Sequence, residues 1–232
     1  SIRFSADNTN STIMVNSLTK NLDSTLKILE EKLYNPGFRE DDFKRVKKQY
    51  IQSVNAAKKE PWSIGGKAFA KVLYGDNILG AYASLKTVDK LTIEDIKNYY
   101  TQYYSPSATS VVVVGDASED EIMKKLDFLN KWSAKEVKIA DLTGGLPEIA
   151  QTQIYIAHKP YSPQSVIFTG HRSLKYDATD EHFKSNVMNY ILGGTFNSRL
   201  NLNLREDKGY TYGIYSGFNA DQYSGIFAVS TS

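Results

Sequence analysis

The chain contains no cysteine and only three histidines among its 232 residues. Without cysteine there are no disulfides and no thiolate chemistry, although this does not fix the compartment. His158, His171 and His182 are eleven or more residues apart, and none belongs to an H-x-x-E-H or H-E-x-x-H motif. Such motifs place two histidines on one helix face, where they can share a zinc ion. We therefore expect no self-contained metal site in this chain.

The sequence also lacks a long apolar run and an excess of one charge sign. A membrane-spanning helix needs ~20 consecutive apolar residues, whereas the run Val111–Val114 has only the length of a short buried strand. The 28 basic and 26 acidic residues leave a net charge of +2, and nucleic-acid binders usually concentrate basic residues on one face. We expect neither a transmembrane segment nor a nucleic-acid partner. The 16 tyrosines are interpreted as amphipathic rims of the core.

Hydrophobic periodicity favours an α+β fold. Apolar residues at steps of three and four, together with capping residues at Thr92 and Ser118, predict helices. They cover residues 18–34, 40–58, 61–73, 179–192 and the stretch that leads to Gly209, with two more beginning after Thr92 and Ser118. Strand patterns cover residues 11–15, 109–114, 153–158, 165–169, 211–218 and 224–229, the last two as a hairpin. Because helices and strands are mixed and the strands occur as antiparallel hairpins, an α+β fold is favoured over a doubly wound sheet.

The composition changes near residue 139, where Thr143-Gly-Gly-Leu-Pro147 indicates a loop. We predict a first domain over residues 1–138, a linker over 139–152 and a second domain over 153–232. The chain opens in Ile2-Arg-Phe4 and closes in Gly225–Ser230, and both segments are strand-like. We therefore expect both domains to be incomplete and the chain to be a fragment of a longer protein.

The most informative stretch lies between residues 192 and 212. It predicts a helix that stops at Gly209 and turns directly into a strand. Arg205 is placed near the helix end, and Tyr212 follows seven residues later on the strand. Such a corner can direct two long polar side chains into one groove. The preceding pair Gly193-Gly194 lacks the Lys-Ser/Thr of a phosphate-binding loop, so close helix packing or a kink is its simpler interpretation.

Two interpretations of the Arg205/Tyr212 pair remain open at this point. In the first, Arg205 forms an ion pair with Glu206 or Asp207 and favours the helix C-terminal dipole, while Tyr212 packs. In the second, the arginine fork holds a peptide carbonyl, and the tyrosine hydroxyl donates to an oxyanion that forms on the scissile carbonyl. Spacing alone favours the first interpretation.

Two sequence blocks resemble the pitrilysin/insulinase-type zinc peptidases. The specific block is Leu192-Gly-Gly-x-x-x-Ser-Arg-Leu200 followed by Leu204-Arg-Glu-x-x-Gly-x-x-Tyr212, which is similar to the pattern of the half that carries no metal. It includes Gly193, Gly194, Ser198, Arg199 and Gly209 as structural motif residues. A looser block combines Leu91-Thr-x-Glu-Asp95, Tyr99–Tyr104 with Pro106, and Val111–Asp116, and the Tyr34-Asn-Pro-Gly-Phe38 segment precedes it.

The resemblance implies two homologous α/β-layer domains, each a mainly antiparallel sheet packed with helices. It further implies a non-catalytic half or subunit that encloses peptide substrates. Arg205 and Tyr212 then reach toward a zinc-bearing partner, which supplies zinc and the general-base glutamate. Active members also carry a third zinc ligand, a glutamate, at a position that aligns near Gln52 or Ser53, and no acidic residue lies between Asp42 and Glu60. A zinc site without that ligand binds weakly, so this chain resembles the inactive type.

Other interpretations stay open. The chain can instead be a peptide-binding or structural core-type module that has lost proteolysis, as in respiratory complexes, or part of an active parent with a displaced third ligand. The resemblance further suggests a bacterial cell-envelope or periplasmic location. The tyrosine-rich apolar surfaces of incomplete domains suggest a homodimer.

Overall fold

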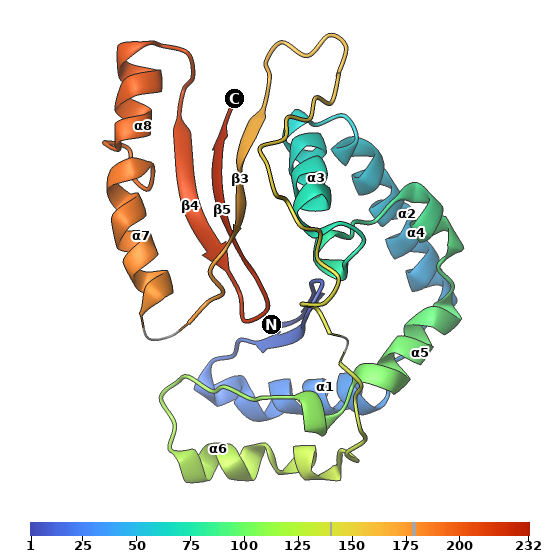
Figure 1. The fold of residues 1–232 in the computed structure, drawn as a ribbon. Helices are drawn as coiled ribbons and strands as arrows, with labels where there is room; N and C mark the ends of the chain where they lie inside the picture. Colours follow the sequence, from blue (N-terminus) through green and yellow to red (C-terminus); the bar gives the residue numbers. More distant parts are fainter. Residues whose placement is uncertain (140, 178–179) are drawn as a thin grey trace. The chain divides into compact units, whose positions relative to one another are not determined.

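The computed structural model describes residues 1–139, 141–177 and 180–232 (Figure 1). The chain forms two compact units, the first made of Ser1–Ile51 and Leu85–Ala140 and the second of Gln52–Ser84 and Asp141–Ser232. Helix α2 (Glu40–Ala57) contributes to both. The domain limits that we predict from the sequence stay a prediction, because compact units need not coincide with homologous domains.

The first unit combines a short hairpin with several helices. Strands β1 (Ile2–Ala6) and β2 (Ser11–Val15) pair antiparallel. Helix α1 (Leu22–Tyr34) buries a stripe of leucines at steps of three and four, as its sequence predicts, and this stripe packs with Phe128 as the core of the unit. The buried leucines are Leu26, Leu29 and Leu33. The remaining helices are α4 (Leu85–Lys90), α5 (Ile93–Tyr103) and α6 (Glu119–Lys125).

Local capping fixes the start of α5, as predicted. The Thr92 side chain accepts a hydrogen bond from the backbone N–H of Asp95, and the Asp95 carboxylate accepts one from the backbone N–H of Thr92. The Ser118/Glu121 pair forms the same capping box at α6. In each case the reciprocal bonds satisfy two backbone donors that the first turn of a helix leaves free.

Thr92→Ala should lower the free energy of unfolding by about 1 kcal/mol, because the side-chain acceptor is lost.

The stabilisation from Asp95 should depend on pH. Hydrogen bonds from Thr92 lower the pKa of the Asp95 carboxyl. The stabilisation from Asp95 is therefore present above the pKa of the unfolded chain and is lost as the pH falls through the lowered folded pKa. Urea unfolding of Asp95→Asn and wild type should differ at pH 7, and the difference should shrink as the pH falls below the ordinary aspartate pKa of 3.8. A difference that persists unchanged at low pH would contradict this account.

The second unit is a three-stranded antiparallel sheet with helices on both faces. Strand β5 (Gly225–Thr231) lies between β3 (Ile167–Ser173) and β4 (Ile214–Ala220). Helix α3 (Pro61–Tyr74) covers one face, where the ring of Phe168 stacks on Phe69 with centroids 5.7 Å apart. Helix α7 (Glu181–Leu192) packs against β4 on the other face (Figure 1). This helix–sheet–helix arrangement confirms the α+β class.

Several expected elements differ in the structure. Residues 109–114 and 153–158, which we predict as strands, pair with no other segment of the described chain. Their apolar side chains, such as Val114 and Ile156, are exposed. A strand pattern shows that a segment suits a sheet, but a ladder forms only where a neighbouring strand satisfies its backbone groups. The helix predicted over 179–192 begins at Glu181, and its first residue, Thr179, lies outside the described residues.

Candidate functional site

The corner between residues 193 and 214 begins with an interrupted helix. We predict helix from the Gly193-Gly194 pair to Gly209, but α7 ends at Leu192 and helical structure resumes only at α8 (Arg199–Asn201). A π-helical turn follows over Leu202–Asp207. Gly209 then adopts φ +62° and closes the helix end, since its N–H donates to the Arg205 carbonyl at 3.0 Å. Glycine suits this left-handed position because it has no Cβ.

Tyr212 is not on a strand, which corrects the prediction, because β4 begins two residues later at Ile214. The Thr211 side chain explains the difference. Its hydroxyl lies 2.7 Å from the Ser232 carbonyl and 3.0 Å from the Gly213 carbonyl, and it accepts a hydrogen bond from the Gly213 N–H. Side-chain bonds therefore hold this segment in place of a backbone ladder, and they turn Tyr212 outward.

The Tyr212 side chain is 86% exposed. Its phenol forms no hydrogen bond with any residue that the structure describes. Tyr212 therefore does not pack against the protein, whereas the first interpretation of the Arg205/Tyr212 pair expects it to pack. The hydroxyl is accessible to a ligand.

Arg205 lies between two neighbours. Its guanidinium Cζ is 4.4 Å from the ring centroid of Phe196, and its Nε is 3.2 Å from a carboxylate oxygen of Glu206. The side chain remains 33% exposed. The ion pair with Glu206 is the local contact that the first interpretation of the pair predicts. The two terminal nitrogens of the guanidinium have no partner among residues 1–139, 141–177 and 180–232.

The glycine pair is explained by close packing. The N–H groups of Gly193 and Gly194 both donate to the Asn189 carbonyl, at 3.0 and 2.9 Å, and the Gly193 carbonyl accepts from the Ser216 N–H at 3.0 Å. A Cβ on Gly193 would lie 2.2 Å from the Ser216 hydroxyl. Strand β4 can approach the end of α7 only because position 193 carries no side chain.

Sequence reasoning missed two buried asparagines that hold the corner together. Asn189 donates to the Ser216 carbonyl at 2.8 Å and accepts from the Ser216 hydroxyl. Asn201, which is fully buried, donates to the Phe196 carbonyl at 2.7 Å and accepts from the Ile214 N–H at 3.3 Å. The only signal in the sequence is a polar residue on the inner face of a helix, where an unpaired amide would be costly.

The other two motif residues differ in their surroundings. Ser198 is the buried N-cap residue that precedes α8, and its hydroxyl has no hydrogen-bond partner among the residues that the structure describes. Arg199 is exposed on the first turn of α8. The structure therefore gives Ser198 a place in the packed corner and leaves Arg199 on its surface.

The histidines lie in ordinary environments. His171 packs against Phe227, with ring centroids 5.7 Å apart, and His182 packs against Tyr176 at 5.2 Å. Within the described ranges, no group of three or more His, Cys, Asp or Glu residues is arranged to hold a metal ion. No described helix is both long and apolar enough to cross a membrane.

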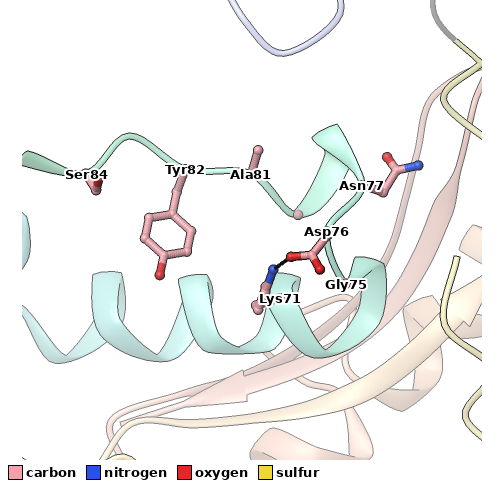
Figure 2. Close-up of a pocket in the computed structure, with 8 residues that line it drawn as sticks. Lys71, Gly75, Asp76, Asn77, Ala81, Tyr82 and Ser84 are labelled. Carbon is pink, nitrogen blue, oxygen red and sulfur yellow. Dashed lines mark hydrogen bonds and ion pairs between the residues drawn. The ribbon is translucent and has the colours of Figure 1, made fainter. Parts of the chain in front are cut away.

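A small surface pocket of about 300 Å³ lies beside the C-terminal end of α3 (Figure 2). Lys71 and Asp76 form an ion pair at its wall. The pocket is lined by none of the residues that the sequence selects for function. We therefore place the candidate site at the Arg205/Tyr212 corner.

The chain thus has an α+β fold whose corner at residues 193–214 presents Arg205 and Tyr212 at its surface. A family model described as the peptidase M16 inactive domain matches residues 90–232, and the chain belongs to this family. The resemblance to pitrilysin/insulinase-type peptidases is thereby confirmed.

Individual relatives agree with this assignment. The chain is 26% identical to an uncharacterized zinc protease, YmxG, of Bacillus subtilis over 91% of its length and 51% of the relative. It is 24% identical to a non-peptidase homolog, YmxG, of Helicobacter pylori, over 83% of the chain and 44% of that protein. The solved peptidase M16 inactive domain from Pseudomonas fluorescens superposes with a TM-score of 0.82 at 25% identity, over all of this chain and 56% of that one. The chain thus spans about half the length of these relatives.

Proposed function

We propose that this chain is the non-catalytic half or subunit of a zinc metalloendopeptidase, which encloses peptide substrates and supplies Arg205 and Tyr212 to a zinc-bearing partner. The observation that carries the proposal is the corner itself. One short segment, fixed by Gly209 and Asn201, presents a partly free guanidinium and an exposed phenol seven residues apart. The match to an inactive-domain family supports the assignment of catalysis to another chain or half.

Each of the two side chains has a distinct role in this proposal. The outer nitrogens of Arg205 donate to a carbonyl of the peptide backbone, and this fixes the position of the substrate. The phenol of Tyr212 donates to the oxyanion that develops on the scissile carbonyl. Zinc held by the partner supplies the Lewis acid and the activated water.

The sequence of helix α2 supports a zinc site that is completed by another chain or half. Its residues 43–57 contain no carboxylate, and the aligned positions carry Gln52 and Ser53. An amide or a hydroxyl replaces poorly the carboxylate ligand that completes such a site. The third ligand therefore comes from the partner in our proposal.

The direct test is the zinc content and activity of the full-length protein that contains this chain. After dialysis against trace zinc, atomic absorption should find far less than one zinc per chain, and hydrolysis of an unstructured peptide should require a zinc-bearing subunit of the same family. About one tightly held zinc per chain, or hydrolysis by the protein alone, would contradict a separate zinc-bearing subunit and leave only the form in which this chain is one half of a longer zinc peptidase. A protein without zinc that no subunit of the family activates would contradict both forms.

A second function has specific support in the ion pair between Arg205 and Glu206 and in the relative that is named a non-peptidase homolog. In this alternative the chain is a peptide-binding or structural module without a proteolytic partner. It requires that no subunit restores cleavage and that Arg205→Ala and Tyr212→Phe leave the function of the assembly intact.

A further inference from the structure

Phe196 is an exposed phenylalanine whose ring contacts Arg205. Phe196 lies in the short connection between the glycine pair and Ser198, and its side chain is 48% exposed, so burial in the core does not explain it. The Arg205 guanidinium lies 4.4 Å from the centre of its ring, within the range of a cation–π contact. The ring thus contacts the guanidinium to which the proposed function assigns peptide binding.

The backbone of Phe196 is hydrogen-bonded to a buried asparagine. Asn201, which is fully buried, donates a 2.7 Å hydrogen bond to the Phe196 carbonyl, and its own oxygen accepts from the Ile214 N–H. One side chain thus connects the Phe196 segment to the start of β4, two residues after Tyr212. Asn201 is therefore bonded both to the backbone of Phe196 and to the segment that follows Tyr212.

We infer that Phe196 is the positioning residue for Arg205, an inference that rests on the proposed function where it concerns peptide binding. The ring holds the face of the guanidinium while the carboxylate of Glu206, 3.2 Å from Nε, holds its inner edge. The two terminal nitrogens have no hydrogen-bond partner among the described residues and are left for the substrate. A long, flexible arginine loses rotamer freedom when it binds, and prior fixation reduces that cost.

The geometric part is tested by NMR on the full chain labelled with ¹⁵N-arginine. The sequence has six arginines, and Arg205→Lys assigns the Nε–Hε signal of Arg205. The ring current of Phe196 should shift this signal upfield in wild type and in Phe196→Tyr, which keeps the aromatic face. Phe196→Leu keeps apolar volume without a ring and should lose the shift. An unshifted signal in wild type, or an equal shift in Phe196→Leu, overturns the inference.

The functional part is tested by binding of a fluorescein-labelled unstructured peptide to the full-length protein. Phe196→Leu should weaken binding about two- to fivefold, the factor for a contact worth ~0.5–1 kcal/mol, and Phe196→Tyr should restore it. In the Arg205→Ala background, Phe196→Leu should have no further effect. An equal loss in that background means that Phe196 contacts peptide directly, which overturns the positioning role.

The two tests fail in different ways. If Arg205→Ala leaves peptide affinity unchanged, the proposed function of Arg205 fails, whereas the ring-current shift still decides the geometry. If the shift is absent but Arg205→Ala weakens binding, the proposed function survives and Phe196 has no part in it.

Discussion

Replacement of Tyr212 by phenylalanine is expected to lower the turnover of the assembled peptidase about 100-fold and to change KM little. Removal of one donor to a developing oxyanion costs on the order of 10²–10³ in rate, because the bond forms in the transition state and not with the bound substrate. The phenol is exposed, so its loss leaves no buried group unpaired. Steady-state hydrolysis of a fluorogenic peptide by the complex, at saturating partner, measures the effect.

Tyr210→Phe is the matched control. Tyr210 lies two residues earlier on the same connection and is also exposed, and its backbone N–H bonds to the Leu204 carbonyl. Its substitution removes an equivalent hydroxyl from the same corner and should leave turnover within about twofold of wild type. Equal losses for the two variants, or an unchanged kcat for Tyr212→Phe, would remove Tyr212 from the proposed chemistry.

The second large effect is expected for Gly193→Ala, which should lower the free energy of unfolding by about 2–3 kcal/mol. The new methyl group would lie 2.2 Å from the Ser216 hydroxyl, 2.8 Å from the Ser216 backbone nitrogen and 2.9 Å from Leu200. Two of these atoms belong to β4, so the strand must move away from the end of α7 and give up the bonds between Gly193, Asn189 and Ser216. Overpacking of this kind typically costs ~1–3 kcal/mol, with the lost hydrogen bonds in addition.

Thermal unfolding followed by circular dichroism should show a decrease in Tm of roughly 5–10 °C for Gly193→Ala, given ~2–4 °C per kcal/mol for a chain of this size. Gly217→Ala is the control on the same strand, because its Cβ would meet only the Asn219 side chain at 3.6 Å, an ordinary contact. It should be neutral or slightly stabilising. A similar loss for both variants would show that the close approach of β4 at Gly193 is not the specific cause of the effect.

The regular elements close to a local signal could be predicted from the sequence. The leucine stripe of α1, the capping box at Thr92 and the helix end at Gly209 all lie where their patterns indicate. Each depends on residues within about four positions of one another, which is the range of helical hydrogen bonds and capping contacts. The family resemblance was readable for the same reason, since its specific motif is a short, continuous segment.

The strand patterns were less informative, because a strand is completed only by its partner. Residues 109–114 and 153–158 carry suitable side chains but pair with no described segment, whereas β3 extends to Ser173, beyond its predicted end, because β5 pairs with it along its whole length. Alternation of side chains indicates a preference, and the ladder depends on a neighbour that can be 50 or more residues away.

By itself the sequence determined the α+β class, the helix boundaries set by caps and glycines, and the pair Arg205/Tyr212 as the candidate site. Only the tertiary structure decided how that site is built. Tyr212 is turned outward because Thr211 bonds to Thr231 and Ser232, about twenty residues further along the chain. Arg205 is held by Phe196 across the helix turn, and Asn201 joins that turn to β4. These contacts connect residues from separate elements, so their geometry follows from packing and not from any local pattern.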